Sequence, residues 1–291
     1  YLGANAVPLH LPMGSEADFE GMIDLVAMKA ITFREKERIV SDIPANYAEQ
    51  ADDARRNLIE KIADIDDEIA DLYLEEAEIK QDQLMAAIRR ATIKLLVTPV
   101  LCGAAYKNKG IQLLLDAVVD YLPSPMDLGA VIAQDPDDEE RTIQRNPSSN
   151  EPFAALAFKL INDPYVGQQT FIRIFSGKLT SGMSFYNTNK MKYERAGRIF
   201  RIKAKEREEI SEAGAGEIVA LVGMKYTKTG DTLCDENQPV LLESIQIPPA
   251  VIEMKVNIED KKNRNKLGEV LAKLCNEDPS FQSHYDEETE E

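Results

Sequence analysis

Two short segments of this 291-residue chain contain residue types that bind phosphate or bases, but their spacing does not suit that chemistry. A phosphate-binding loop of the form Gly-x-x-x-x-Gly-Lys-Ser/Thr cradles phosphates with backbone N–H groups and its lysine. Gly177 and Lys178 come nearest to it. However, Leu179 follows where Ser or Thr is required, and no glycine lies five residues before Gly177. The sequence therefore predicts no phosphate loop.

The second segment, Asn189-Lys190-Met191-Lys192, imitates the Asn-Lys-x-Asp motif that recognises guanine in GTP-binding proteins. The carboxylate of that motif accepts hydrogen bonds from the base, whereas Lys192 can only donate. The imitation fails on charge. We therefore expect that this chain alone neither binds nor hydrolyses GTP.

Other catalytic and metal-binding patterns are sparse. The histidines are His10 and His284, and no Cys-x-x-Cys, His-x-x-x-His or calcium-loop spacing is present. We predict no catalytic residue and no metal site. Cys102, Cys234 and Cys275 are odd in number and far apart, which favours a reducing cytoplasm over a disulfide framework. No apolar run approaches the ~20 residues that span a bilayer, so no membrane is expected.

The elements of the first part alternate between strands and helices. Residues 6–12 predict a short strand, and residues 79–97 predict a helix. Residues 45–75 predict one long helix. Its apolar stripe steps by four, three, four and three residues, through Leu58, Ile62, Ile65, Ile69 and Leu72.

A strand, a turn of small residues and a helix come next. We expect a buried strand at 97–101, a tight turn at 102–105 and a helix that begins after Gly110 and is stopped by Pro123 and Pro125. This order is typical of an α/β unit. The residues expected to face inward on this helix are Ile111, Leu114, Leu115, Val118 and Leu122.

The second part is rich in strands. The polar residues 127–150 predict a connection or exposed loop. Closely spaced turns beyond it favour a small β-barrel, with strands expected at 153–161, 171–175, 183–188, 195–202 and 217–222. A strand at 251–258 follows, and a further strand begins at Phe281. The helix between them carries Leu267, Val270, Leu271 and Leu274.

Charge is distributed unevenly along the chain. The net charge of −17 argues against nucleic-acid binding by the chain as a whole. Residues 41–90 contain 14 acidic and 6 basic side chains, whereas residues 171–210 contain 10 basic and 4 acidic ones. Both regions have the ordinary interpretation of solvated surface. Alternatively, the first faces a basic protein and the second faces phosphate.

Residues 163–182, DPYVGQQTFIRIFSGKLTSG, resemble the second domain of bacterial elongation factor G, a translational GTPase. Residues 98–125 resemble the end of that family's GTP-binding domain. Residues 243–281 resemble the linker to its third domain and the first half of that domain. The resemblance therefore runs through essentially the whole chain. It implies an internal fragment, as do the start at Tyr1 and the acidic end DEETEE.

The resemblance implies a multidomain α/β plus all-β fold. Residues 1–128 would be the C-terminal part of a P-loop GTPase domain, with an α/β insertion at about 14–96. Residues 129–243 would be the translation-factor β-barrel. Residues 244–291 would be the N-terminal half of an α+β, ferredoxin-like third domain.

The resemblance also implies sites. The loop at Gly103, Ala104 and Ala105 helps to fix the guanine in the family, which usually has Ser at the position of Ala104. Small residues also simply fit a tight turn between strand and helix. Small-subunit ribosomal RNA is the partner implied for the barrel, through Arg173, Lys190, Lys192, Arg195, Arg198, Arg201, Lys203 and Lys205. Residues 195–205 contain no aromatic residue beyond Phe200, so no base stacking is expected along that segment. The C-terminal domain of the ribosomal stalk protein is the partner implied for Asp64, Asp67, Glu68, Asp71 and Glu75.

The implied parent uses GTP/GDP and magnesium to drive translocation of tRNA and mRNA through the ribosome. The chain itself is then expected to be a monomeric, cytoplasmic, ribosome-contacting scaffold with no cofactor bound. Two alternatives remain open. One is a paralogous translational GTPase of the ribosome-recycling, release-factor or ribosomal-protection type. The other is a stand-alone ribosome-binding module.

Overall fold

The computed structural model describes residues 3–34, 37–163, 167–243, 245, 251–256 and 264–284. The chain forms two compact units, Tyr1–Pro123 and Ser124–Glu291. The domain boundaries expected at 128/129 and 243/244 stay predictions.

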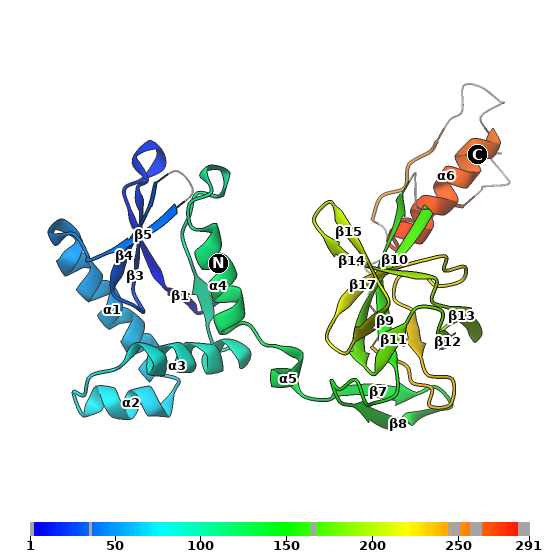
Figure 1. Ribbon diagram of the computed structural model, residues 1–291, viewed down its shortest axis with the longest axis horizontal. Coiled ribbons are helices and arrows are strands. Elements are labelled where there is room, and N and C mark those ends of the chain that lie inside the picture. The colour runs from blue at the N-terminus through cyan, green and yellow to red at the C-terminus, as the bar shows by residue number, and fades with distance from the viewer. Residues whose placement is uncertain are drawn as a thin grey trace. The chain divides into compact units, whose positions relative to one another are not determined.

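The first unit contains two sheets (Figure 1). In the smaller one, β1 (Ala6–Pro8) pairs in parallel with β6 (Thr98–Val100). The larger sheet is antiparallel and follows chain order through β2 (His10–Met13), β3 (Gly21–Asp24), β4 (Lys29–Arg34) and β5 (Glu37–Ser41). The single strand expected over residues 6–12 is thus two strands in different sheets.

Much of the core of this unit comes from helices α1 (Ala48–Ala63), α2 (Asp67–Leu74) and α3 (Gln81–Ile93). Leu58 and Ile62 of α1, Ile69 of α2 and Leu84 and Ile88 of α3 are fully buried in one cluster. The apolar stripe expected from the sequence is therefore confirmed as the buried side of these helices.

The single long helix expected over residues 45–75 is wrong, because the chain breaks between α1 and α2. Asp66 has an extended backbone, and its carboxylate accepts a hydrogen bond from the N–H of Ile69. An aspartate in this conformation is a favourable N-cap. A new helix therefore starts after Asp66 while the apolar stripe continues.

The strand and helix that close this unit differ from expectation in burial. Thr98 and Val100 of β6 are exposed, because β1 is the only strand of the described chain that pairs with β6. Helix α4 (Ile111–Tyr121) buries Leu113, Ala117 and Tyr121. Four of the five residues expected to face inward are instead at least 45 % exposed: Leu114, Leu115, Val118 and Leu122. The fifth, Ile111, is half-buried. The helix is apolar almost all round, so its sequence pattern could not select one face.

The second unit contains an eight-stranded sheet in the order β13-β12-β18-β9-β10-β17-β14-β15. Its long central hairpin joins β9 (Ala154–Asp163) to β10 (Gly167–Ser176). The other strands are β12 (Ser184–Asn187), β13 (Lys192–Arg195), β14 (Arg198–Lys203), β15 (Glu206–Ile210), β17 (Ile218–Val222) and β18 (Thr232–Cys234). A short pair, β11 (Lys178–Thr180) and β16 (Glu212–Gly214), accompanies it.

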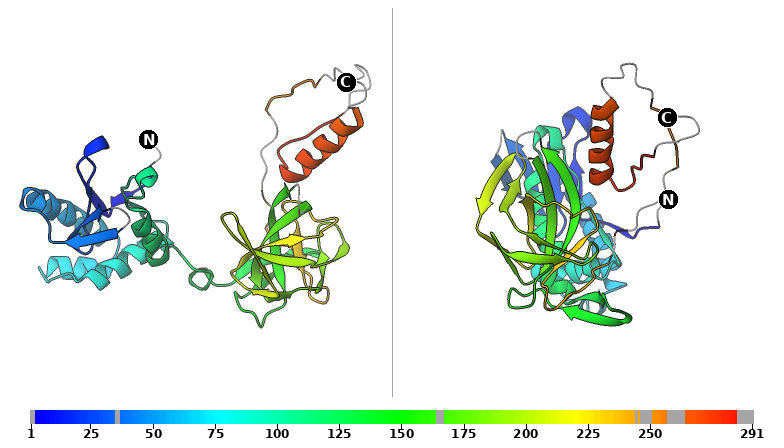
Figure 2. Two further views of the ribbon diagram at one scale, coloured as in Figure 1. Left: turned by 45° about the horizontal axis from the view of Figure 1, so that its top comes forward. Right: turned by 90° about the vertical axis from the view of Figure 1, so that its right-hand side faces the viewer.

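The sheet curls on itself (Figure 2). Phe185 of β12 and Ile199 of β14 belong to the same buried cluster, although four strands separate β12 from β14 in the sheet. This arrangement agrees with the barrel-like domain expected from the closely spaced turns.

Residues expected to form a loop before this sheet form a hairpin instead. β7 (Val131–Asp135) pairs with β8 (Asp138–Arg145), and Gln134 bridges to Leu241. Ala133 packs with Val240 in a small cluster. A strand with one face in water needs few buried residues. The polar composition of this segment therefore concealed the hairpin from the sequence analysis.

The C-terminal part holds α6 (Arg264–Glu277), which confirms the expected helix. The strand expected at 251–258 is absent from residues 251–256, and residues 257–258 lie outside the described chain. Residues 281–284 form no strand either. α6 lies beside β9, where the Glu277 carboxylate accepts a hydrogen bond of 2.6 Å from the N–H of Asn162.

Candidate nucleic-acid and partner-binding surfaces

The small-residue turn at Gly103, Ala104 and Ala105 is closed by two backbone hydrogen bonds. The Ala104 N–H donates to the Lys109 carbonyl at 2.9 Å, and the Lys109 N–H donates back at 3.1 Å. A side chain at Gly103 would lie 2.8 Å from the Lys109 carbonyl oxygen, so the turn needs glycine there. Ala105 is exposed and begins a 3-10 helix, whose first N–H groups have no acceptor within the helix.

The basic residues of the hairpin β14–β15 are matched by acidic neighbours. Arg201 contacts Glu217 at 2.5 Å and Glu208 at 3.9 Å, and Lys203 contacts Glu208 at 3.2 Å. The Glu217 carboxylate raises the pKa of Arg201. The pKa of Glu217 is lowered by the Gly214 N–H and by Arg201. This hairpin therefore presents paired charges and little net positive charge to a phosphate.

Lys190, Lys192 and Arg195 lie at the other edge of the sheet. The Lys192 Nζ is 4.2 Å from the ring centroid of Tyr226, and the Lys190 Nζ is 3.5 Å from Asp231. The Arg195 Nε donates to the Gly182 carbonyl oxygen, in the turn before β12, at 2.7 Å. The structure thus places Lys192 against an aromatic side chain that the sequence analysis did not select, whereas Arg195 lies at the opposite end of the hairpin β12–β13.

The remaining basic candidates are dispersed. The Arg173 guanidinium lies 4.8 Å from the ring of Phe175, and that of Arg198 lies 5.5 Å from the ring of Phe200. Lys205 is exposed in the turn between β14 and β15. The eight basic residues selected from the sequence therefore do not form one patch.

The five acidic candidates of the first unit are all exposed or half-buried at the surface: Asp64, Asp67, Glu68, Asp71 and Glu75. They do not lie on one long helix. Asp64 ends α1, and Glu68 pairs with Arg90 at 2.8 Å. Asp67, Asp71 and Glu75 are spaced by four residues along α2 and so share one face. That face is the acidic stripe that a basic partner could meet.

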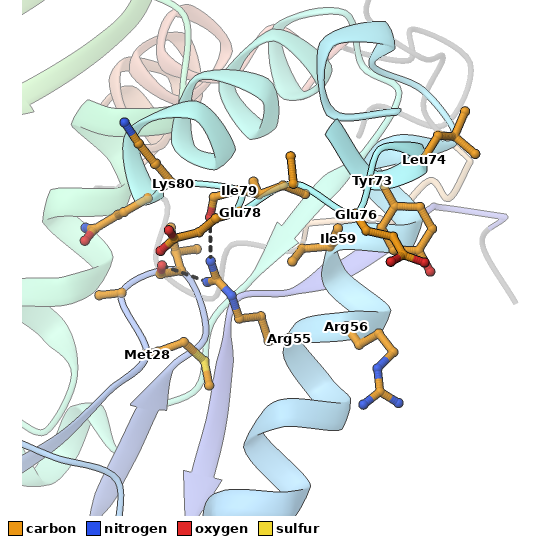
Figure 3. A pocket seen from close by; sticks show the side chains of 14 residues that line it. Met28, Arg55, Arg56, Ile59, Tyr73, Leu74, Glu76, Glu78, Ile79 and Lys80 are labelled. Atoms are coloured by element: carbon orange, nitrogen blue, oxygen red, sulfur yellow. Dashed lines mark hydrogen bonds between the residues drawn. The ribbon is translucent and has the colours of Figure 1, made fainter. Parts of the chain in front are cut away.

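A groove of about 840 Å³ lies between α1, the turn after β3 and the connection from α2 to α3 (Figure 3). The Arg55 guanidinium donates to the carbonyl oxygens of Leu25 at 2.6 Å, Val26 at 2.9 Å and Ile79 at 3.2 Å. Burial lowers the pKa of Arg55. Its hydrogen bonds join three segments of the backbone, so we assign Arg55 a structural role.

No group of three or more His, Cys, Asp or Glu side chains that could hold a metal ion occurs in the described chain. His10 is buried, and burial lowers the pKa of its imidazole, which is neutral at neutral pH. Within the same residues, none of the helices has the length and apolar character needed to cross a membrane.

Two family models and a solved structure match this chain. Residues 152–236 match the family model of elongation factor G domain 2, and residues 247–291 match that of elongation factor G domain III. A crystal structure of a protein from Thermus thermophilus superposes with a TM-score of 0.80 at 24 % sequence identity, which shows a shared fold. The match covers 98 % of this chain and 40 % of the Thermus chain.

Two regions of the second unit are therefore similar to domains of a translation factor. The curled sheet resembles domain 2 of elongation factor G, and the residues that follow it match the model of domain III, so the chain is elongation factor G-like.

Proposed function

We propose that this chain is part of an elongation factor G-type translational GTPase and supplies ribosome-contacting surface to it. The observation that carries the proposal is the order of the two matched domains on one chain, behind an α/β unit. The chain spans 40 % of the solved protein that it resembles. The intact factor would use GTP hydrolysis to promote movement of tRNA and mRNA in the cytoplasm.

The turn at Gly103, Ala104 and Ala105 would contact guanine in the intact factor, through the N–H groups that begin its 3-10 helix. It is one element of a nucleotide site. The sequence contains neither a phosphate loop nor Asn-Lys-x-Asp, so GTP/GDP and magnesium would be held elsewhere. Calorimetric titration of this chain with GDP should give no measurable heat. Micromolar affinity would contradict this part of the proposal.

The acidic stripe at Asp67, Asp71 and Glu75 would steer a basic partner by complementary potential. We propose that this partner is the C-terminal domain of the ribosomal stalk protein. Replacing Asp67 and Asp71 by lysine should abolish binding of the purified stalk domain at low salt. Asp52→Lys, an exposed change on α1, is the matched control and should bind as the unmodified chain does.

Ribosome contact is tested by sedimentation. The 291-residue chain should pellet with bacterial ribosomes through a sucrose cushion, and less of it should pellet as the salt concentration rises. An acidic protein of similar net charge but different fold is the control, and it should stay in the supernatant. A chain that stays in the supernatant at every salt concentration would refute the proposed function.

A further inference from the structure

The tripeptide Met-Lys-Tyr occurs twice in the chain, at 191–193 and 224–226. The fold brings the two copies together. The first leads into β13, which ends the eight-stranded sheet, and the second lies in the loop after β17. The Lys192 Nζ lies 4.2 Å from the ring centroid of Tyr226. We name the surface formed by residues 189–193 and 224–228 the lysine–tyrosine edge.

The carboxylate of Glu194 holds the loop of this edge from inside. Glu194 is 8 % exposed. It accepts hydrogen bonds from the N–H of Lys225 at 2.6 Å, from the N–H of Tyr226 at 3.2 Å and from the Thr227 hydroxyl at 2.5 Å. Its charge is therefore directed at the loop, and these hydrogen bonds hold the loop backbone in one conformation.

Asp231 does the same at the far end of the loop. It is 4 % exposed and accepts hydrogen bonds from the Asn187 side-chain amide at 3.0 Å and from the N–H of Lys228 at 2.8 Å. It also pairs with Lys190 at 3.5 Å. Both of these carboxylates beside the edge thus point inward.

The outward charge of the edge is therefore positive. Lys192, Lys225 and Lys228 are exposed, and none of them has a carboxylate within 4.0 Å among the described residues. Arg201 and Lys203 of β14 differ, because Glu208 and Glu217 neutralise them. On a chain with a net charge of −17, this is a local site for an anionic partner.

An exposed aromatic ring completes the edge. Tyr193 is 63 % exposed, and its ring leans on that of Tyr186, with 5.3 Å between their centroids. Successive side chains of a strand point to opposite faces. The side chains of Lys192 and Tyr193 therefore project from opposite faces of the same edge strand. A polymer that crosses this strand can contact both.

We propose that the lysine–tyrosine edge binds single-stranded RNA, with Lys192, Lys225 and Lys228 at phosphates and the ring of Tyr193 stacked on an unpaired base. This inference rests on the proposed function and gives it a defined RNA site. Lysines on an edge strand also discourage strand pairing, but that role explains Lys192 and not the lysines of the loop. An acidic peptide would pair with the lysines but would not need the exposed ring of Tyr193, on which an unpaired base can stack.

Binding of a fluorescein-labelled single-stranded oligouridine of about 12 nucleotides, measured by fluorescence anisotropy over a salt series, tests the inference. The wild-type chain should bind this RNA more tightly than a duplex of the same length. Lys225→Gln should weaken binding and lower the salt slope by about one. The matched control is Lys203→Gln, which removes a neutralised lysine and should leave binding unchanged.

The ring is tested separately. Tyr193→Ala should weaken binding about 5- to 150-fold, the range for loss of one stacked base. Tyr193→Phe should restore it, and circular dichroism should show that both variants are folded. The inference is overturned if the wild-type chain does not bind the oligonucleotide, if Tyr193→Ala binds as Tyr193→Phe does, or if Lys203→Gln weakens binding as much as Lys225→Gln. If these results occur while the chain still pellets with ribosomes, this inference alone fails. If the wild-type chain does not pellet either, the proposed function fails as well.

Discussion

Replacement of Asp66 by alanine should destabilise the first unit more than any other change in its acidic segment. The Asp66 side chain caps α2 through the N–H of Ile69 and makes two hydrogen bonds of 2.9 Å with Arg90. Loss of an N-cap costs about 1 kcal/mol. Loss of a charge-assisted pair adds about 1–2 kcal/mol, because the Arg90 side chain is 40 % exposed and partly screened. We therefore expect a loss of about 2–3 kcal/mol in the free energy of unfolding.

Asp66→Asn separates the two contributions, because asparagine caps a helix as well as aspartate does but carries no charge. It should cost about 1–2 kcal/mol, which is the ion-pair part. Asp71→Ala is the control on the exposed face of the same helix, and it should stay within about 0.5 kcal/mol of the wild-type chain.

The advantage of the wild-type chain over the Asp66→Asn variant should depend on pH. The hydrogen bonds from Arg90 hold the pKa of Asp66 below its usual range. A carboxylate whose folded-state pKa is depressed stabilises the fold above its unfolded pKa of about 3.9. This contribution is lost as pH falls through the lower, folded-state pKa. The two proteins should therefore differ at neutral pH and converge in strong acid.

Urea unfolding followed by circular dichroism at a helix wavelength measures these differences, because most of the helical residues of the described chain, those of α1, α2, α3 and α4, belong to the first unit, whereas α6 belongs to the second. If the free energy of unfolding of Asp66→Ala lies within about 0.5 kcal/mol of the wild-type value, Asp66 does not stabilise the break between α1 and α2, and that assignment is refuted. Equal loss in Asp66→Asn and Asp66→Ala would refute the capping part alone.

Two further predictions concern the second unit. Gly177→Ala should cost about 3–5 kcal/mol, because φ is +74° and the new methyl would lie 2.6 Å from backbone atoms of Phe153. Gly223→Ala, at φ +94° with open space around it, should cost about 1–2 kcal/mol, and thermal unfolding measures both. In a thiol titration of the folded chain, half-buried Cys275 should react and buried Cys234 should not. Reaction of Cys234 without unfolding would contradict its place in the core.

The spacing of apolar residues predicted the helices that bury one regular apolar stripe. The stripe through Leu58, Ile62 and Ile69 is buried as expected, and the helix at residues 264–277 is present. Asp66 is also a residue type that favours a helix N-cap. The continuous apolar stripe concealed the break, because α1 and α2 bury the same side on either side of it.

The parts that the sequence could not predict depend on contacts between distant residues. Helix α4 is apolar on all sides but the one that carries Gln112, Asp116 and Asp120, so its buried face is decided by its neighbours in space. The basic residues looked alike along the chain, yet Arg201 is neutralised by Glu217 whereas Lys192 lies on Tyr226. The repeated Met-Lys-Tyr was the one local signal of the lysine–tyrosine edge, and only the fold shows that its copies meet.

Competition on the ribosome tests the central claim most directly. The chain, labelled with a fluorophore at half-buried Cys275, would be bound to bacterial ribosomes and then challenged with unlabelled intact elongation factor G and a non-hydrolysable GTP analogue. If the chain is part of an elongation factor G-type GTPase, the intact factor should displace it completely, because both use the same surface. A chain that remains bound while the intact factor saturates the ribosome would contradict the account.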